Sequence, residues 1–361
     1  MDLSIYDLNF NRLGVVDIAS SVIWHRQYAT AGSFEILAPA TEYYISLLQR
    51  GRIVYRQDAV ESGIIDTIQI KQDESGATIT ATGRMLSGIL GQRIIETPVN
   101  LNTTAEQAMR QLVESNAISP ADSGRIVPSL MLSDLQGFNI PLVAYIKRQN
   151  LLECLGKISQ VSTLGFRVRM DIPAKRYVFE VYSGFNRSAS QSATPRAIFS
   201  EDTDTLTGMS YSATNTGTVN AVIAKSVDMT ITEGGGQTGF DRYEKIVEVD
   251  PVTYTIENSE GNSYTYVDIA QTQAAMRSAA DEQLAAPEPE SFEGDVLTGT
   301  NSLIYRQDYD LGDIVTVRSN RYGLSAHVRI TAIDEVYDEN GTQIVPTFGS
   351  PLPSLIDIFK E

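Results

Sequence analysis

Short runs of alternating hydrophobic and polar residues dominate the first ninety residues and predict β-strands. They are rich in β-branched and aromatic residues and are separated by Gly, Pro and acidic residues, as is typical of hairpins. The predicted strands are Ser21–Tyr28, Ser33–Leu37, Ile53–Tyr55, Ile64–Ile70 and Thr78–Thr82. Between the last two, Asp73–Gly76 predicts a turn.

From about residue 94 the hydrophobic period becomes helical. Thr103–Glu106 has the pattern of a capping box, and an apolar face follows at Ala105, Ala108, Met109, Leu112 and Val113. A second helix is predicted to begin at Asn150 and to stop near Gly165, with an apolar face of Leu151, Leu152, Leu155, Ile158 and Val161. Strands at Phe166–Met170 and Tyr177–Tyr182 complete a small α/β segment, which we expect to fold around its own core, built from the two helix faces and these strands.

A polar stretch at 183–195 predicts a boundary, and the chain from 199 to 350 is again strand-like. Strands predicted at Asn220–Ile231 and Arg242–Val249 flank the glycine-rich segment 232–239, which we expect to be an exposed, mobile hairpin tip. One helix is predicted at about 268–286, before Pro287.

The two strand-rich regions share an ordered set of landmarks. Ser33-Phe34-Glu35, Gly51-Arg52-Ile53-Val54, a turn at Gly76 and a strand ending at Gly83 mark the first. Ser291-Phe292-Glu293, Gly312-Asp313-Ile314-Val315, a turn at Gly341 and a strand ending near Gly349 mark the second. The gaps between landmarks are similar, which predicts an internal duplication.

These patterns predict an α+β, mostly β protein with two related β-barrels and an α/β insertion between them. The expected domains are 1–93 (first barrel), 94–198 (insertion) and 199–350 (second barrel, with the helix), followed by a C-terminal tail at 351–361. The length of 361 residues suits two to three domains. Two like barrels in one chain suit a symmetric ring, because each copy then supplies two similar sectors.

Composition narrows the possible functions. The formal net charge of −17 disfavours DNA binding through the whole surface. No apolar run approaches the roughly 18 residues of a membrane span, and the acidic N-terminus does not resemble a signal peptide. We therefore expect a soluble protein synthesised in the cytoplasm.

Few residues are candidates for catalysis. The one cysteine, Cys154, borders the apolar face of its predicted helix, which favours a small buried hydrophobe over a nucleophile. The two histidines, His25 and His327, stand in or beside strands with no partner nearby in sequence. We predict no catalytic residue, although abundant carboxylates leave a glycosidase pair open.

Metal and phosphate sites are also not predicted. Asp308, Asp310 and Asp313 fail the EF-hand spacing and are expected to serve turn chemistry before the strand at Ile314. Glu201–Asp204 is expected to be a solvated loop. Gly234-Gly235-Gly236 lacks the Lys and Ser or Thr of a phosphate-binding loop. We expect no cofactor and no metal.

Six segments stand in a fixed order along the chain: Tyr6–Arg12, Ile23–Arg26, Gly83–Leu90, Leu164–Val168, Ser291–Gly294 and Asp308–Val317. Together they resemble the phage tail-tip or baseplate hub family of siphophages of Gram-positive hosts. That family is similar to the baseplate hubs of contractile tails and to the N-terminal structural part of tail-associated lysins. The resemblance extends to about Gly349.

The resemblance implies a structural virion protein at the tail tip. It implies a homotrimer whose two barrels per chain form a pseudo-six-fold ring, which adapts the hexameric tail tube to a three-fold tip. Implied partners are a distal tail or tail tube protein, the tape-measure protein, and fibre or tip proteins, with DNA only in transit. Two alternatives stay open, a tail-associated cell-wall hydrolase and a carbohydrate-binding host-recognition module.

Overall fold

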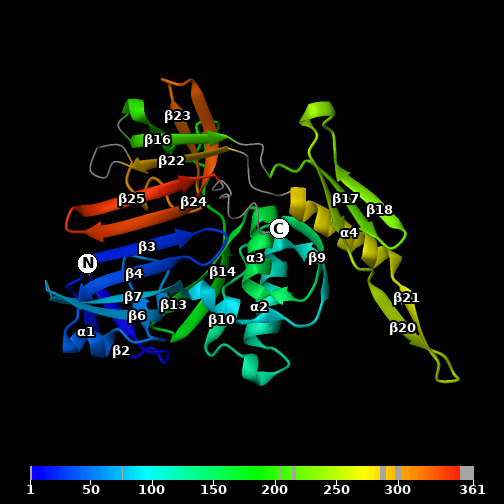
Figure 1. Cartoon of the computed structure of the whole chain (residues 1–361), viewed down its shortest axis with the longest axis horizontal. Helices are drawn as coiled ribbons and strands as arrows, with labels where there is room; N and C mark the ends of the chain where they lie inside the picture. Colours follow the sequence, from blue (N-terminus) through cyan, green and yellow to red (C-terminus); the bar gives the residue numbers. More distant parts are fainter. Residues whose placement is uncertain are drawn as a thin grey trace.

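A long, mostly antiparallel sheet organises the fold (Figure 1). The computed structural model describes residues 2–74, 76–203, 205–213, 217–284, 290–296 and 303–349, so the tail predicted at 351–361 lies outside the described residues. The main path of the sheet runs through β16 (Leu206–Ala213), β22 (Glu290–Val296), β25 (Gly341–Phe348), β24 (Leu324–Asp338), β3 (Ser21–Gln27), β4 (Ser33–Pro39), β7 (Gly76–Met85), β6 (Gly63–Asp73), β5 (Ile53–Tyr55), β1 (Leu3–Tyr6) and β2 (Arg12–Val16). Two further strands, β15 (Ile198–Ser200) and β23 (Ile314–Ser319), join it beside β24.

The same pairing order occurs twice in this sheet. In the first strand-rich region β3, β4, β7, β6 and β5 are neighbours in that order, and in the second β16, β22, β25, β24 and β23 are. The register also repeats, because Glu35 lies opposite Thr82 and Glu293 lies opposite Thr347. The Ser-Phe-Glu landmarks of the sequence therefore occupy equivalent strand positions.

We call these two groups of five strands the first and second strand sets. The β6–β7 hairpin of the first set and the β24–β25 hairpin of the second match residue by residue. Asp73 lies opposite Gly76, and Asp338 lies opposite Gly341. Each hairpin also carries an irregularity at the same distance from its turn, between Ile65 and Thr67 in β6 and between Ile330 and Ala332 in β24. One landmark was misaligned by a residue, because Gly83 corresponds to Phe348 and not to Gly349.

Side chains alternate across the first strand set, so one face is apolar and one polar. The apolar face buries Trp24, Phe34 and Ile79 against β1, β2 and a short helix, α1 (Glu42–Leu47). Thr41 caps α1 by accepting a hydrogen bond from the Tyr44 N–H at 3.1 Å. The sequence pattern missed α1, since six residues are too few to display a helical period.

The segment after β7 contains the two predicted helices and the two predicted strands. Its helices are η1 (Leu86–Gln92), α2 (Ala105–Val113), η2 (Glu114–Ile118), η3 (Ser123–Arg125) and α3 (Leu151–Ser162). Its strands are β8 (Ile94–Ile95), β9 (Val99–Thr104), β10 (Leu130–Leu132), β11 (Pro141–Ile146), β12 (Gln149–Asn150), β13 (Gly165–Asp171) and β14 (Arg176–Tyr182). The parallel pairing of β10 with β14 completes a three-stranded sheet with β13.

The helix ends differ in detail from the sequence prediction. Thr104, and not Thr103, is the N-cap of α2, and the Glu106 carboxylate accepts hydrogen bonds from the N–H groups of residues 136, 137 and 138 instead of closing a capping box. Helix α3 ends at Thr163, which adopts a left-handed φ of 59°, and Gly165 begins the next strand. Val161 is 40% exposed, so it does not belong to the buried face of α3.

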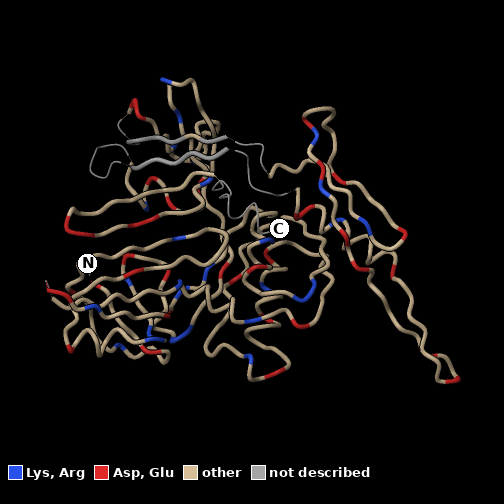
Figure 2. The backbone as a smooth tube through the Cα atoms, in the orientation of Figure 1, with Lys and Arg blue, Asp and Glu red and all other residues tan. Residues whose placement is uncertain are grey.

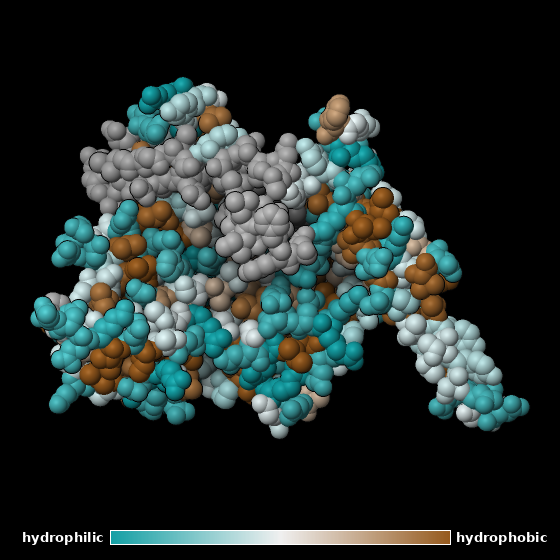
Figure 3. All heavy atoms as spheres, in the orientation of Figure 1, coloured by the Kyte–Doolittle hydropathy of each residue, from teal (hydrophilic) through white to brown (hydrophobic). Residues whose placement is uncertain are grey.

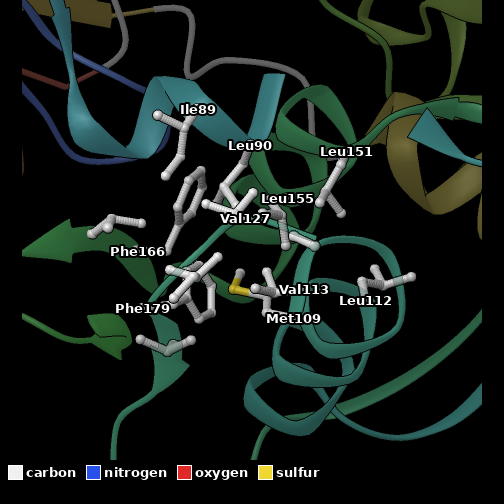
Figure 4. Packing of buried hydrophobic residues seen from close by; sticks show 14 of the residues in the cluster. Ile89, Leu90, Met109, Leu112, Val113, Val127, Leu151, Leu155, Phe166 and Phe179 are labelled. Carbon is white, nitrogen blue, oxygen red and sulfur yellow. The ribbon is translucent and has the colours of Figure 1, made fainter. Parts of the chain in front are cut away.

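A single apolar cluster fills the space between α2, α3 and the β13–β14 hairpin (Figure 4). Met109, Leu155 and Phe166 lie at its centre and are fully buried. The cluster also includes Phe10 and Leu90 from the first ninety residues. The core of this segment is therefore shared with the first strand-rich region, where the sequence predicted a core of its own.

Residues 217–284 form a second excursion from the long sheet, inserted between β16 and β22. It contains β17 (Ala221–Ser226), β18 (Met229–Gly234), η5 (Gly239–Asp241), β19 (Glu244–Glu248), β20 (Thr253–Glu257), β21 (Ser263–Val267) and α4 (Ile269–Leu284), which lies where the sequence predicts a helix. The prediction of a hairpin tip at 232–239 was wrong, because β18 and β19 pair with opposite edges of β17. The glycines instead belong to a crossover between two strands that are not neighbours.

We expect Leu155→Ala to lower the free energy of unfolding by roughly 2–5 kcal/mol, because Leu155 is fully buried and its truncation leaves a cavity. Val161→Ala, on the same helix, is the matched control and should cost well under half as much, because Val161 is exposed. Urea unfolding followed by far-ultraviolet circular dichroism measures both. Equal losses for the two variants would contradict the assigned burial.

Candidate functional site

The two strand sets join where the second half of β24 pairs with β3, and charged side chains are buried under this junction. Ala332–Tyr337 lies opposite Val22–Gln27 in antiparallel register. Arg26 of β3 is 2% exposed and donates two hydrogen bonds to the Glu61 carboxylate, at 2.9 and 2.8 Å. Its remaining nitrogen donates to Asp310 at 2.5 Å and to the Tyr305 hydroxyl at 2.6 Å. Arg26 thus ties both strand sets together.

A second buried carboxylate, Glu335, lies on the β24 side of the junction. It is fully buried and accepts hydrogen bonds from Arg56 at 2.8 Å and Arg306 at 2.7 Å. The hydroxyls of Tyr305 and Tyr337 donate to it as well, at 2.9 and 2.7 Å. These charge-assisted bonds satisfy the carboxylate on every side, which makes its burial tolerable. We call Arg26, Arg56, Glu61, Tyr305, Arg306, Asp310 and Glu335 the junction network.

Arg56 also makes cation–π contacts at the junction. The Arg56 guanidinium lies 5.1 Å from the ring centres of both Trp24 and Tyr337. Trp24 is fully buried in the apolar core of the first strand set, so Arg56 connects that core to the network.

Electrostatics keep the network ionised. Burial alone would raise the pKa of Glu61, but the adjacent Arg26 guanidinium outweighs burial and holds that pKa at about 2. In the same way, burial opposes ionisation of Glu335, and Arg56 and Arg306 together hold its pKa below the ordinary value. The network therefore consists of charged pairs at neutral pH.

Tyr28 connects the segment after β7 to the junction. Its backbone N–H donates to the Thr331 carbonyl and its hydroxyl to the Thr163 carbonyl, both at 3.0 Å. The ring fills the space beside Gly165 and Gly312, where an added Cβ would lie 2.4 and 2.3 Å from ring atoms. The two strand-rich regions and the segment after β7 thus all meet at the ring of Tyr28.

Each of the three aspartates singled out in the sequence accepts a hydrogen bond from a nearby backbone N–H, that of Ile304 for Asp308, Leu311 for Asp310 and Asp310 for Asp313, as predicted for turn residues. Asp308 accepts the Ile304 N–H at 2.7 Å, which is the expected turn chemistry. Asp310 belongs to the junction network, and the sequence pattern gave no sign of that. Asp313 is buried and accepts hydrogen bonds from the Phe185 N–H at 2.7 Å and from Arg187 at 2.8 Å. This last pair fastens the polar stretch 183–195 to β23.

Among the described residues, no hydrogen bond links Cys154, His25 or His327 to another of the three. Cys154 is buried in α3, and burial raises the pKa of its thiol to about 12. His25 contacts the Asp334 carboxylate at 2.7 Å, on the face of the sheet opposite to the junction network. His327 contacts the Thr316 hydroxyl at 2.9 Å.

The remaining sequence candidates lie at the surface or outside the described residues. Glu201 and Asp202 belong to a 3-10 turn, η4 (Glu201–Thr203), while Asp204 lies outside the described residues. Within the described ranges, no group of three or more His, Cys, Asp and Glu residues is arranged to hold a metal ion. Across those same ranges, none of the helices combines the length and apolarity that crossing a membrane requires.

The polar face of the long sheet is continuous across the junction. In register from strand to strand it carries mostly uncharged side chains, among them Thr67, Gln69, Thr78, Thr80, Thr82, Ser33, Gln343 and Thr347. The charged residues on it include Glu35, Lys71, Arg84 and Asp334, with Asp73 and Asp338 beside the two hairpin turns. Four of these are acidic and two are basic, so this face is mildly acidic.

The hairpin formed by β20 and β21 projects away from the rest of the molecule (Figure 3). Tyr254 and Ile256 lie opposite Tyr266 and Tyr264, so all four share one face of the hairpin, and each is about half exposed. The rings of Tyr254 and Tyr266 stack with centres 5.8 Å apart. Acidic residues mark the tip of this hairpin (Figure 2).

Three solved structures share this fold over nearly the whole chain. A tail protein from Neisseria meningitidis MC58 has a TM-score of 0.60 at 16% identity and covers 97% of this chain and 96% of its own. The 43 kDa tail protein of prophage MuSo2 from Shewanella oneidensis has 0.58 at 14%, covering 96% and 98%. Prophage tail protein gp18 from Listeria monocytogenes EGD-e has 0.50 at 13%, covering 99% and 97%. At these identities the likeness establishes a common fold.

The chain thus has the fold of phage and prophage tail proteins. It belongs to the Siphovirus ReqiPepy6 Gp37-like protein family, which matches residues 2–350. No curated protein matches the chain.

We expect Glu61→Gln to destabilise the protein by about 3–5 kcal/mol at pH 7, because Arg26 loses its bidentate partner in a buried site. Glu74→Gln, at an exposed turn, is the control and should change little. Urea unfolding over a pH series measures the difference.

The same comparison has a defined pH dependence. The pKa of Glu61 is lowered from 4.5 to about 2 on folding, so its contribution is fully present above pH 4.5 and is lost as pH falls toward 2. The gap between the wild type and Glu61→Gln should therefore narrow over that range. A gap that stays constant between pH 5 and about pH 2 would show that Glu61 does not act through its charge.

Proposed function

We propose that this tail protein is a hub, in which three copies form a ring of six similar sectors at the tail tip. The observation that carries the proposal is the repeated strand set, with its matching register and matching irregularities. Each set curls around its own apolar cluster, and we propose that the sets act as two related barrels within domains at 1–93 and 199–350, separated by the 94–198 insertion.

Such a ring suits a change of symmetry. Three chains with two like sectors each present six similar surfaces to a hexameric tube and three identical surfaces to a tip. The proposed partners are accordingly a distal tail or tube protein, the tape-measure protein inside it, and fibre or tip proteins below. The three solved tail proteins of the same fold support placing this chain in a tail assembly.

The continuous polar face of the sheet is the proposed wall of the ring's lumen, through which DNA passes during ejection. Threonine, serine and glutamine side chains offer no array of positive charge to hold phosphates. The wall would let DNA slide, and the acidic charge of the chain would keep it from binding DNA elsewhere.

In this proposal the protein is not an enzyme and needs no cofactor. The hydrolase alternative would require an accessible nucleophile or acid–base pair, and a cell-wall zymogram distinguishes it. The carbohydrate-binding alternative draws support from one observation, the half-exposed tyrosine face of the β20–β21 hairpin. Glycan-array binding that disappears in Tyr254→Ala would favour that role.

We expect light scattering of the purified protein to give three times the chain mass of 39.6 kDa, or one chain mass that triples on a tail partner. The reason is that heterologous contacts between similar sectors must close to avoid open polymers. A stable dimer would contradict the hub.

We expect the wild-type trimer not to retain short duplex DNA at physiological salt, whereas Gln69→Lys/Thr80→Lys should bind it in a strongly salt-dependent manner. The two substitutions add six positive charges per trimer to the proposed lumen wall. Ala121→Lys/Ser123→Lys adds the same charge at exposed positions of the insertion and is the control. Fluorescence anisotropy measures binding, and equal binding by both variants would argue against a lumen at this face.

A further inference from the structure

The outer edge of β24 is divided between two partners. Its first part, Leu324–Arg329, pairs with β23, and its second part, Ala332–Tyr337, pairs with β3 beyond the irregularity. Both partners contact the same edge, because β25 occupies the other edge. The second strand set thus pairs with the first set through the outer edge of β24, which binds β3.

In β6, the counterpart of β24, only the first part of this edge is paired. Gly63 and Ile64 pair with β5, as Val328 and Arg329 of β24 pair with β23. Among the described residues, Thr67–Gln72 has β7 on one edge and no strand on the other. The open stretch begins just beyond the irregularity, at the place where β24 receives β3.

The counterpart of β3 is also an end strand. Trp24 lies opposite Phe34, and Tyr211 of β16 lies opposite Phe292, so Trp24 and Tyr211 are equivalent. β16 pairs with β22 and ends the main path of the sheet within the described part of the chain. Each copy therefore has an open edge on β6, the counterpart of β24, and an end strand, β16, the counterpart of β3. In the residues described for one copy, β6 and β16 do not pair, although β24 and β3 do.

We propose that β6 of one copy pairs with β16 of the next copy, in the antiparallel register that β24 and β3 show within the chain. This inference rests on the proposed function, and it names the surfaces that close the ring. Carrying the register across places Gln69 opposite Ser212 of the next copy, as Asp334 lies opposite His25. It places Ile70 opposite Tyr211, as Glu335 lies opposite Trp24.

The side chain of Ile70 supports this partner. It corresponds to Glu335, which is fully buried at the intrachain junction, yet Ile70 is 50% exposed in the single chain. An exposed isoleucine beside an unpaired backbone edge is a site for strand addition. A second copy covers it and satisfies the edge hydrogen bonds at the same time. Because the contact is heterologous and each copy offers two of six sectors, it closes after three copies.

Disulfide trapping tests this junction. Gln69→Cys/Ser212→Cys places two thiols at the proposed contact, and Lys71→Cys/Ser210→Cys is a second pair in the same register. His25→Cys/Asp334→Cys occupies the corresponding positions within one chain and is the positive control. Thr80→Cys/Ser212→Cys moves one thiol a strand away, to β7, and is the negative control. Cys154 is buried in every variant and does not compete.

After oxidation, non-reducing gels should show both in-register pairs as a band of three chain masses that reduction removes. The positive control should form its disulfide within a single chain, and the negative control should give no covalent trimer. If light scattering shows a wild-type trimer but neither in-register pair links, the junction is wrong and the hub stands. A ladder extending beyond three chains would overturn ring closure, and a chain that stays monomeric with its tail partner present would overturn the hub itself.

Discussion

The pairing of β24 with β3 is the constraint on which the rest of the structure depends. It makes one sheet from two strand sets that lie some three hundred residues apart in the chain. Long-range pairing of this kind is entropically costly, so it needs contacts that reward the correct register. The junction network supplies them, because Arg26 reaches Asp310 and Arg56 reaches Glu335 only when β3 and β24 meet in this register.

Buried charge at this junction fixes geometry more than it adds stability. A buried ion pair recovers its desolvation cost only when every hydrogen bond is made, and shifted strands would leave Glu335 without Arg56. The proposed contact between copies differs in kind, since Ile70 takes the place of Glu335. A carboxylate at this position would be hydrated in the free chain and would lose that hydration on assembly, whereas covering Ile70 favours assembly. The permanent junction therefore buries ion pairs, and the proposed junction between copies buries an apolar side chain.

The duplication could be predicted from sequence because turn glycines and the Ser-Phe-Glu step are local features that register preserves. Phe34 and Phe292, for example, occupy equivalent positions in their sheets. The junction network could not be predicted, because Arg26 and Asp310 are 284 residues apart and nothing in either local pattern pairs the two side chains. The crossover at 232–239 was misread for a related reason. Gly234–Gly236 signals a change of direction, but not which strand the chain meets next.

Charge distribution links this architecture to passage of DNA. The chain carries a net charge of −17, and on the polar face that runs from β6 to β25 Glu35 and Asp334 are matched by Lys71 and Arg84, while Asp73 and Asp338 lie beside the hairpin turns. Acidic residues gather instead at hairpin turns (Figure 2). A basic wall would hold the phosphate backbone by counterion release, and a strongly acidic wall would oppose its entry. A mildly acidic surface rich in hydroxyl and amide groups does neither, so the proposed lumen combines low friction with free access.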